Sequence, residues 1–187
     1  MAGKLCFTIL LLTSSSVQSA IGADAEEPFW LDIDTTNAQL TVRDKHNVAQ
    51  ASFGQISIGR GGASKQRQRG DLSTPIGDYR ITSIQPSSRY GVFIALNYPN
   101  RDQAEQARQA GRISTTDYRR LLAAEDSGAT PPADTALGGN IGLHGLGAGD
   151  IRVHQAMNWT RGCVALTNQQ VSALLPWIRV GTRVQIR

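Results

Sequence analysis

The stretch that decides the fold of this chain is Asn140-Ile-Gly-Leu-His144-Gly145, followed further on by Thr160-Arg161-Gly162-Cys163-Val-Ala-Leu166. Each segment contains a short apolar run, which predicts two short strands, one ending at His144 and one beginning at Cys163. Glycines surround His144, a setting that favours a cleft over a packed core. The two segments therefore predict strand ends that present His144 and Cys163 at a cleft.

The first 23 residues have the layout of a secretory signal peptide. Lys4 precedes the apolar run 5–12, and small residues follow, with cleavage possible after Ala20, Ala23 or Ala25. The apolar run is shorter than the roughly 20 residues of a spanning helix, and no later segment is long and apolar enough to cross a bilayer. We expect a periplasmic or secreted protein with no membrane span.

The rest of the chain, residues 28–187, is expected to form one domain with a core that is stable without disulfides. The formal net charge of the sequence is +4, a mild excess that does not indicate nucleic acid as a partner. The glycine-rich segment 59–70 is interpreted as a solvated surface loop, with binding of an anionic polymer as the alternative. Its basic residues are Arg60, Lys65, Arg67 and Arg69.

The periodicity of apolar residues predicts a mainly β fold with a few short helices. Strands are expected around Leu31 and Ile33, Leu40 and Val42, Ile56 and Ile58, and over 75–82, 91–98 and 183–187. The segment 101–125 predicts two short helices separated at 111–114, and 126–140 predicts a long irregular connection. Thr167 and Gln170 have capping-box spacing, which predicts a further helix.

Cys163 is the only cysteine left once the signal peptide, with Cys6, is removed. A single thiol in an exported protein indicates a reactive group or an intermolecular bridge, whereas a buried, inert cysteine is the alternative. A thiol needs a base to become a nucleophile. His46 lies among turn residues and is assigned to solvent, which leaves His144 as the candidate base. Backbone N–H groups of Gly162 and Cys163 are candidate oxyanion donors.

These residues carry a family resemblance. His144-Gly145 and Thr160-Arg161-Gly162-Cys163-Val164 resemble the His-Gly and Ser/Thr-x-Gly-Cys-Ile/Val signature of L,D-transpeptidases with the YkuD-type catalytic domain. Upstream, Thr74-Pro75-Ile-Gly77-Asp-Tyr79 is similar to the Thr-Pro-x-Gly-x-Phe/Tyr strand of that family. The resemblance extends over about residues 28–187.

The resemblance implies a β-sandwich or barrel-like fold and a cysteine acyltransferase that needs no cofactor. Cys163 would attack the carbonyl of meso-diaminopimelate at position 3 of a peptidoglycan stem peptide, and D-alanine at position 4 would leave. His144 would act as general base and acid, with the Gly145 carbonyl orienting its ring and Gly162 beside the oxyanion. Thr160, Arg161 and His154 would contact the substrate.

Two positions depart from the commonest family pattern. Arg161 stands where many members have His, and Ala165 stands where many have Arg. The continuation Gly-Cys-Val-Ala-Leu-Thr-Asn is similar to a subgroup that includes an enzyme cleaving lipoprotein from peptidoglycan. The acyl acceptor therefore stays open between an amine, from a second stem peptide or a lipoprotein lysine, and water, which would make the enzyme a hydrolase.

Two other readings compete with the cysteine enzyme. A zinc site from His144, His154 and Cys163 would use common zinc ligands, but their spacing fits no standard zinc pattern, and we expect no metal. A non-catalytic cell-wall binding module would keep the fold and use the basic loop 60–69 for attachment.

Overall fold

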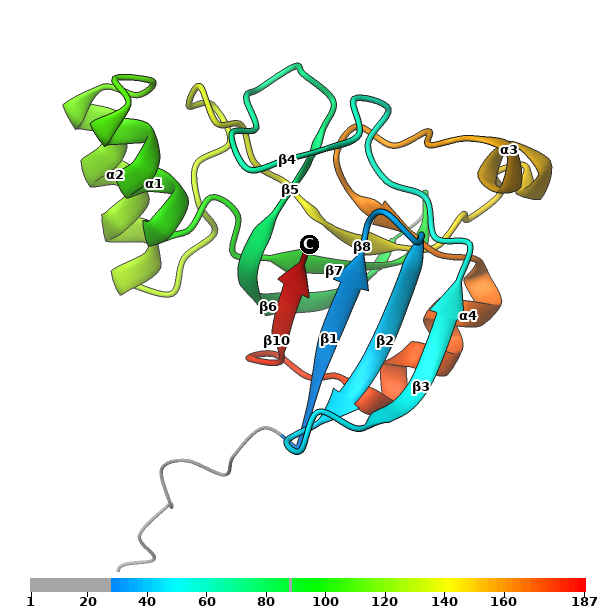
Figure 1. Cartoon of the computed structure of the whole chain (residues 1–187). Coiled ribbons are helices and arrows are strands. Elements are labelled where there is room, and N and C mark those ends of the chain that lie inside the picture. The colour runs from blue at the N-terminus through cyan, green and yellow to red at the C-terminus, as the bar shows by residue number, and fades with distance from the viewer. Residues whose placement is uncertain (1–27, 88) are drawn as a thin grey trace, which may run out of the picture.

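The computed structural model describes residues 28–87 and 89–187 and shows a curled β-sheet flanked by short helices (Figure 1). The predicted signal peptide lies outside the described residues. The strands are β1 Phe29–Asp34, β2 Gln39–Asp44, β3 Ala49–Gly54, β4 Ala63–Ser64, β5 Thr74–Pro75, β6 Gly77–Ser87, β7 Gly91–Leu96, β8 Gly142–His144, β9 Val164–Ala165 and β10 Arg183–Ile186. The helices are α1 Arg101–Gln109, α2 Thr115–Asp126, α3 Ile151–Ala156 and α4 Asn168–Leu174, which continues into the 3-10 turn Leu175–Trp177. In the described part of the chain, no helix has the length and apolar content to cross a membrane.

Eight strands form one mixed sheet in the order β3-β2-β1-β10-β6-β7-β8-β9. The pairs β1–β10 and β8–β9 are parallel, and the other neighbours are antiparallel. The chain just after β3 reaches back to β9: Ser57 and Ala165 exchange backbone hydrogen bonds of 2.9 and 2.7 Å. Because the two ends of the sheet meet there, the sheet closes in the manner of a barrel, and the predicted mainly β class is confirmed.

The predicted N-terminal meander is present, with one correction. Asp34 and Asp44 each accept backbone N–H groups of the turn that follows, which ends β1 and β2 where the polar residues stand. The strand expected around Ile56 and Ile58 is wrong, because β3 ends at Gly54. Both isoleucines are buried, since the segment that carries them makes the closing bridges to β9 and Thr160.

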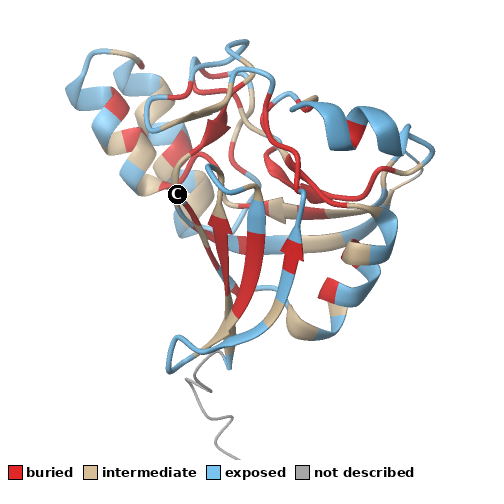
Figure 2. Cartoon of the chain, turned by 45° about the vertical axis from the view of Figure 1, so that its right-hand side comes forward, coloured by how far each residue is buried: buried red, intermediate tan, exposed pale blue. Residues whose placement is uncertain are grey.

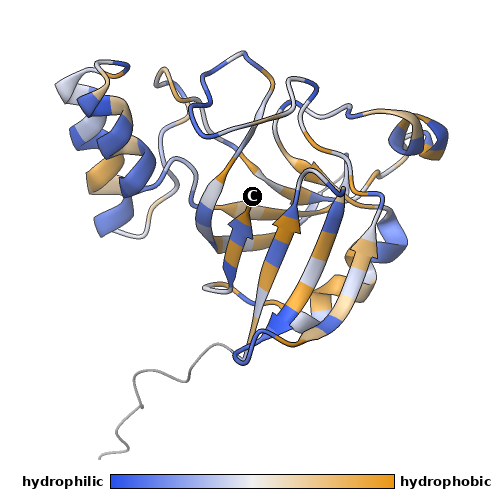
Figure 3. Cartoon of the chain, in the orientation of Figure 1, coloured by the Kyte–Doolittle hydropathy of each residue, from blue (hydrophilic) through white to orange (hydrophobic). Residues whose placement is uncertain are grey.

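The core fills the inside of the curled sheet. Figure 2 shows buried residues concentrated on the strands, while the outer faces of the helices are exposed, and Figure 3 shows apolar residues alternating with polar ones along β1 and β2. Leu31 and Ile33 of β1, Leu143 of β8 and Val164 of β9 are fully buried. The sheet is therefore apolar on its inner face, as the alternating pattern predicted.

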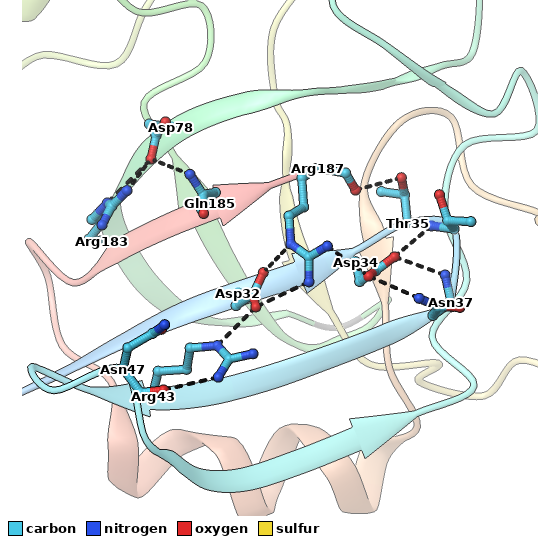
Figure 4. Close-up of polar contacts among 11 residues, drawn as sticks. Asp32, Asp34, Thr35, Asn37, Arg43, Asn47, Asp78, Arg183, Gln185 and Arg187 are labelled. Atoms are coloured by element: carbon cyan, nitrogen blue, oxygen red, sulfur yellow. Dashed lines mark hydrogen bonds and ion pairs between the residues drawn. The ribbon is translucent and has the colours of Figure 1, made fainter.

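A carboxylate on the opposite face of β1 from Leu31 and Ile33 is also buried. Asp32 accepts hydrogen bonds from Arg43 of β2 (2.9 Å) and from Arg187 beside β10 (2.8 Å) (Figure 4). Burial acts to raise the pKa of Asp32, but the hydrogen bonds and charges of the two arginines outweigh it and leave the pKa below its usual value. Asp32 thus links the two strands that flank β1.

The helices follow their predicted caps. Ser114 caps α2, and Thr167 and Gln170 form the capping box that starts α4. Pro176 lies in the 3-10 turn that follows α4, where a proline cannot continue the α-helical hydrogen bonds. Helix α3 was not expected from the sequence, and its N-cap is Asp150.

The segment 59–70 departs from the predicted surface loop. Residues Ala63–Ser64 form β4, which pairs in parallel with β5. Arg67 is only 7% exposed, whereas Arg60, Lys65 and Arg69 are exposed. The loop interpretation therefore fails at Arg67, whose side chain points into the molecule.

Candidate active site

The strand pair β8–β9 sets the positions of His144 and Cys163. Leu143 is in register with Val164, and His144 with Ala165. Continuing the register places Cys163, just before β9, beside Gly142, two residues back from His144 along the neighbouring strand. Residues two apart share a face of a sheet, so both side chains project to the same side. Both line one pocket of about 1020 Å³.

The ring of His144 is held on several sides. Its Nδ1 lies 2.7 Å from the carbonyl oxygen of Gly145, so Nδ1 carries the proton that is donated and Nε2 is left as the basic nitrogen. Tyr90 stacks on the ring with centroids 4.0 Å apart, and Trp159 meets it edge-on at 5.6 Å. Burial lowers the pKa of His144, opposed by the hydrogen bond to Gly145. The imidazole is thus oriented and neutral at pH 7.

Gly145 allows this close arrangement. A Cβ at this position would lie 2.6 Å from the side-chain oxygen of Asn168 and 2.8 Å from the carbonyl oxygen of Tyr90. No side chain fits there without displacing one of these groups. Gly145 is thus a position where other segments pack closely against the end of β8.

The thiol of Cys163 is half-buried at the other end of the pocket wall. Its Sγ lies 3.5 Å from the carbonyl oxygen of Asn140. Burial raises the pKa of the Cys163 thiol, and the backbone N–H of Gly142 and the charge of Arg67 oppose this rise without reversing it. Burial thus favours the neutral form of both the thiol and the imidazole.

The turn before Cys163 is held by Thr160, which also lines the pocket, and by Gly162. The hydroxyl of Thr160 donates to the carbonyl of Cys163 (2.6 Å) and accepts from the N–H of Gly162 (3.1 Å). Gly162 has φ +124°, and a Cβ there would lie 2.7 Å from the carbonyl oxygen of Ser73. The N–H of Gly162 is therefore engaged within the turn rather than aimed at an oxyanion, and the Thr160 hydroxyl stabilises the turn.

His154 does not line the pocket with Cys163. It is buried on α3, and its Nδ1 accepts a hydrogen bond from Trp159 Nε1 at 3.2 Å. Burial lowers the pKa of His154, and a hydrogen bond to the Gln55 backbone opposes this. Trp159 contacts both histidines, and His154 is not among the residues that line the pocket. In residues 28–87 and 89–187, no three His, Cys, Asp or Glu side chains gather as metal ligands.

Arg67 is a pocket residue that the sequence reasoning missed. Its guanidinium donates to the carbonyl oxygens of Ser73 (2.8 Å) and Leu137 (2.6 Å), and it reaches that of Arg161 at 3.5 Å. It also lies over the Tyr98 ring, 5.3 Å from the centroid. Three separate segments of the pocket wall are thereby joined by one buried cation. Tyr90 was also missed, because an aromatic residue before a strand carries no signal of its own.

The remaining pocket wall is basic. Arg60, Arg69, Arg89 and Arg161 line it in addition to Arg67, and none of the described lining residues is Asp or Glu. Arg161, predicted to contact the substrate, is exposed at this wall. The arrangement suits a ligand with negative charge that brings a carbonyl group to Cys163.

The family of the chain follows from comparison with known proteins. Residues 28–186 match the model of the YkuD L,D-transpeptidase catalytic domain. The chain belongs to this family, and the resemblance of the His-Gly and Gly-Cys segments is confirmed at the level of the family. No curated protein sequence matches the chain significantly.

Solved structures share the fold. The helical cell shape determining protein Pgp2 from Campylobacter jejuni is 20% identical with a TM-score of 0.59, and the match covers 85% of this chain and 47% of that one. Bd1075 from Bdellovibrio bacteriovorus is 19% identical with a TM-score of 0.55, covering 88% and 49%. The chain thus spans about half the length of these structures.

Proposed function

We propose that this protein is an exported cysteine L,D-transpeptidase that acts on peptidoglycan stem peptides through an acyl-enzyme on Cys163. The observation that carries the proposal is the placement of a thiol and an oriented, neutral imidazole on one face of β8–β9, inside one basic pocket. Membership of the L,D-transpeptidase family supplies the reaction class.

The first half-reaction uses His144 as base and then as acid. Nε2 of His144 takes the proton of the Cys163 thiol as sulfur attacks the carbonyl carbon of meso-diaminopimelate at position 3. The tetrahedral intermediate collapses, the bond to the nitrogen of D-alanine breaks, and His144 returns the proton to this nitrogen. D-Alanine leaves and a thioester remains on Cys163. Burial favours the neutral form of both groups, and in this proposal the proton moves to His144 as the sulfur attacks.

In the second half-reaction an amine attacks the thioester carbonyl and His144 receives the proton of the attacking nitrogen. The bond between the carbonyl carbon and sulfur then breaks, and His144 returns the proton to the sulfur of Cys163. Water in the same position gives hydrolysis. This alternative stays open because Ala165 departs from the commonest family pattern and because the residues that follow Cys163 resemble a subgroup that includes a cleaving enzyme. An amine acceptor would be a second stem peptide or a lipoprotein lysine.

Incubation with a tetrapeptide stem tests the proposal by intact mass. The wild type is expected to gain the mass of the stem minus D-alanine on Cys163, and the Cys163→Ala variant is expected to gain nothing. Addition of an amine-bearing stem separates the acceptors, since a cross-linked product indicates transpeptidation and a shortened stem indicates hydrolysis. Wild-type protein that releases no D-alanine and carries no adduct would rule out the enzyme.

The non-catalytic binding module makes a different prediction. It requires salt-sensitive binding to peptidoglycan sacculi without loss of D-alanine from any stem. Binding that is equal in wild type and Cys163→Ala, with no acylation of either, would favour it.

Export is proposed from the signal-peptide pattern in residues 1–23. The mature protein, with its domain over 28–187, should be recovered from the periplasm or the medium with an N-terminus between residues 21 and 26. N-terminal mass measurement of the secreted protein checks this, and an intact Met1 in the cytoplasmic fraction would contradict it.

A further inference from the structure

Several arginines outside the pocket are paired with carboxylates. Around the fold, Arg43, Arg120, Arg183 and Arg187 each form an ion pair with an aspartate. Some arginines outside the pocket, such as Arg119, have no such partner, and within residues 28–87 and 89–187 none of the arginines that line the pocket has one. These are Arg60, Arg67, Arg69, Arg89 and Arg161. Unpaired cations in a concave wall without carboxylates indicate a site for an anion.

Two of these cations lie side by side next to the nucleophile. Gly59 and Thr160 form a parallel bridge, and the N–H of Arg60 donates to the carbonyl of Thr160 at 3.0 Å. The next residues of the two segments are Arg60 and Arg161, both exposed. Like charges on neighbouring strands repel each other, and an anion bound by both side chains would offset this repulsion.

The rest of the structure fixes this pair relative to the thiol. Arg161 is two residues before Cys163, and its carbonyl oxygen faces the guanidinium of Arg67. The hydrogen bonds of Thr160 and the positive φ of Gly162, which other residues rarely adopt, keep the intervening turn in one shape. The backbone that carries Arg161 therefore cannot shift without disturbing Cys163.

We propose that Arg60 and Arg161 form a carboxylate-binding subsite that selects stem peptides with a free carboxylate close to the scissile bond. This inference rests on the proposed function for the identity of the substrate. A guanidinium binds a carboxylate with two parallel hydrogen bonds, and two guanidinium groups hold it from two sides. In a tetrapeptide stem, two carboxylates come from the residues joined by the scissile bond: the α-carboxylate of D-alanine and the free carboxylate of meso-diaminopimelate.

Amidated stems test the subsite and separate the two carboxylates. Three tetrapeptide stems are compared: unmodified, amidated at D-alanine, and amidated at meso-diaminopimelate. Affinity is measured by calorimetry with the Cys163→Ala variant, and acylation rate is measured by mass with the wild type. We expect one of the two amidated stems to bind about ten- to hundredfold more weakly than the unmodified stem, since a charge-assisted pair is lost. The stem that loses affinity identifies the carboxylate.

Arginine variants provide the second arm. In the Cys163→Ala background, Arg60→Gln and Arg161→Gln should each weaken binding of the unmodified stem roughly tenfold. Each should also remove most of the difference in affinity between the unmodified and the amidated stem. Arg119→Gln is the matched control, because Arg119 is an exposed cation on α2, away from this pocket. It should leave affinity and discrimination as they are.

The possible results distinguish failure of the subsite proposal from failure of the proposed catalysis. Equal affinity for all three stems, or unchanged discrimination in both arginine variants, overturns the subsite even if the wild type is acylated normally. Binding that depends on a carboxylate and on Arg60 and Arg161, without acylation of the wild type, supports the subsite and contradicts the proposed catalysis.

Discussion

The imidazole of His144 lies against the ring of Tyr90, with centroids 4.0 Å apart and planes inclined by 27°. This stack covers one face of the imidazole, while the Gly145 carbonyl holds Nδ1. The two contacts leave the ring one orientation. Tyr90 is therefore a positioning residue for the proposed base.

Removal of the Tyr90 ring should slow acylation of Cys163. In Tyr90→Ala the imidazole gains freedom to rotate, and a misplaced catalytic group costs roughly ten- to hundredfold in rate. Tyr90→Phe keeps the stack and should stay within about threefold of wild type. Single-turnover acylation by a tetrapeptide stem measures both. Equal rates for Ala and Phe at equal folded fraction would show that the stack has no positioning role.

Loss of the Arg67 charge should make Cys163 less reactive. Arg67 opposes the rise of the Cys163 pKa caused by burial, so Arg67→Met raises this pKa further. We expect alkylation by iodoacetamide at about pH 8 to slow roughly three- to tenfold. Arg67→Lys, which keeps the charge, should lie between Met and wild type.

Two further measurements show whether Arg67 acts by charge or by structure. Thermal unfolding reports the cost of leaving the Ser73 and Leu137 carbonyls without their donor. Arg69→Gln removes an exposed pocket cation and is the control. A pH profile of alkylation identical in Arg67→Met and wild type would leave Arg67 with a structural role alone.

Acidification should destabilise the fold through its two buried histidines. Burial lowers the pKa values of His144 and His154 in the folded chain, from the ordinary 6.5. As pH falls, the two histidines become protonated first in the unfolded chain. Their contribution to stability is therefore complete above about pH 6.5 and decreases as pH falls toward their lower pKa values in the folded chain. Each such proton costs up to about 1.4 kcal/mol per pH unit.

His154→Gln tests this linkage. A glutamine oxygen can still accept from Trp159 Nε1, but it does not titrate. Urea unfolding between about pH 7 and pH 5 should show a shallower loss of stability in the variant than in the wild type. An unchanged slope would mean that His154 is protonated alike in the folded and unfolded chains.

The buried carboxylate of Asp32 should matter more than an exposed one. Asp32→Asn removes the charge that pairs with Arg43 and Arg187, and we expect a loss of roughly 1–3 kcal/mol in the free energy of unfolding. Asp78→Asn removes the half-exposed pair with Arg183 (Figure 4) and should cost less than about 1 kcal/mol. Urea unfolding at pH 7 compares them, and equal losses would contradict the role of burial.

The two arginine partners of Asp32 also predict a loss of folding stability at low pH. Because its pKa is lowered in the folded chain, its contribution to stability is present above the ordinary value of 3.8 and is lost as pH falls through the folded-state pKa. Asp32→Asn should not show this loss of stability at low pH.

The sequence by itself determined most of the elements, because their signals are local. Alternating residues such as Leu31 and Ile33 specify a strand face, and the Thr167 and Gln170 pair specifies a helix start. The short runs ending at His144 and beginning at Cys163 likewise became β8 and β9. Family membership followed from the same two segments.

Only the tertiary structure decided what surrounds these residues. Ile56 and Ile58 have strand periodicity but close the barrel, since their pairing partners lie about a hundred residues later. Arg67 lies in a segment predicted to be a surface loop, but its side chain is buried because it donates hydrogen bonds to carbonyl oxygens of distant segments. The positions of His154 behind Trp159, of Tyr90 on His144, and of Arg60 beside Arg161 arise from non-local contacts. Local patterns carry no record of such contacts, so the two strand ends that carry His144 and Cys163 were predictable and the electrostatic environment of these residues was not.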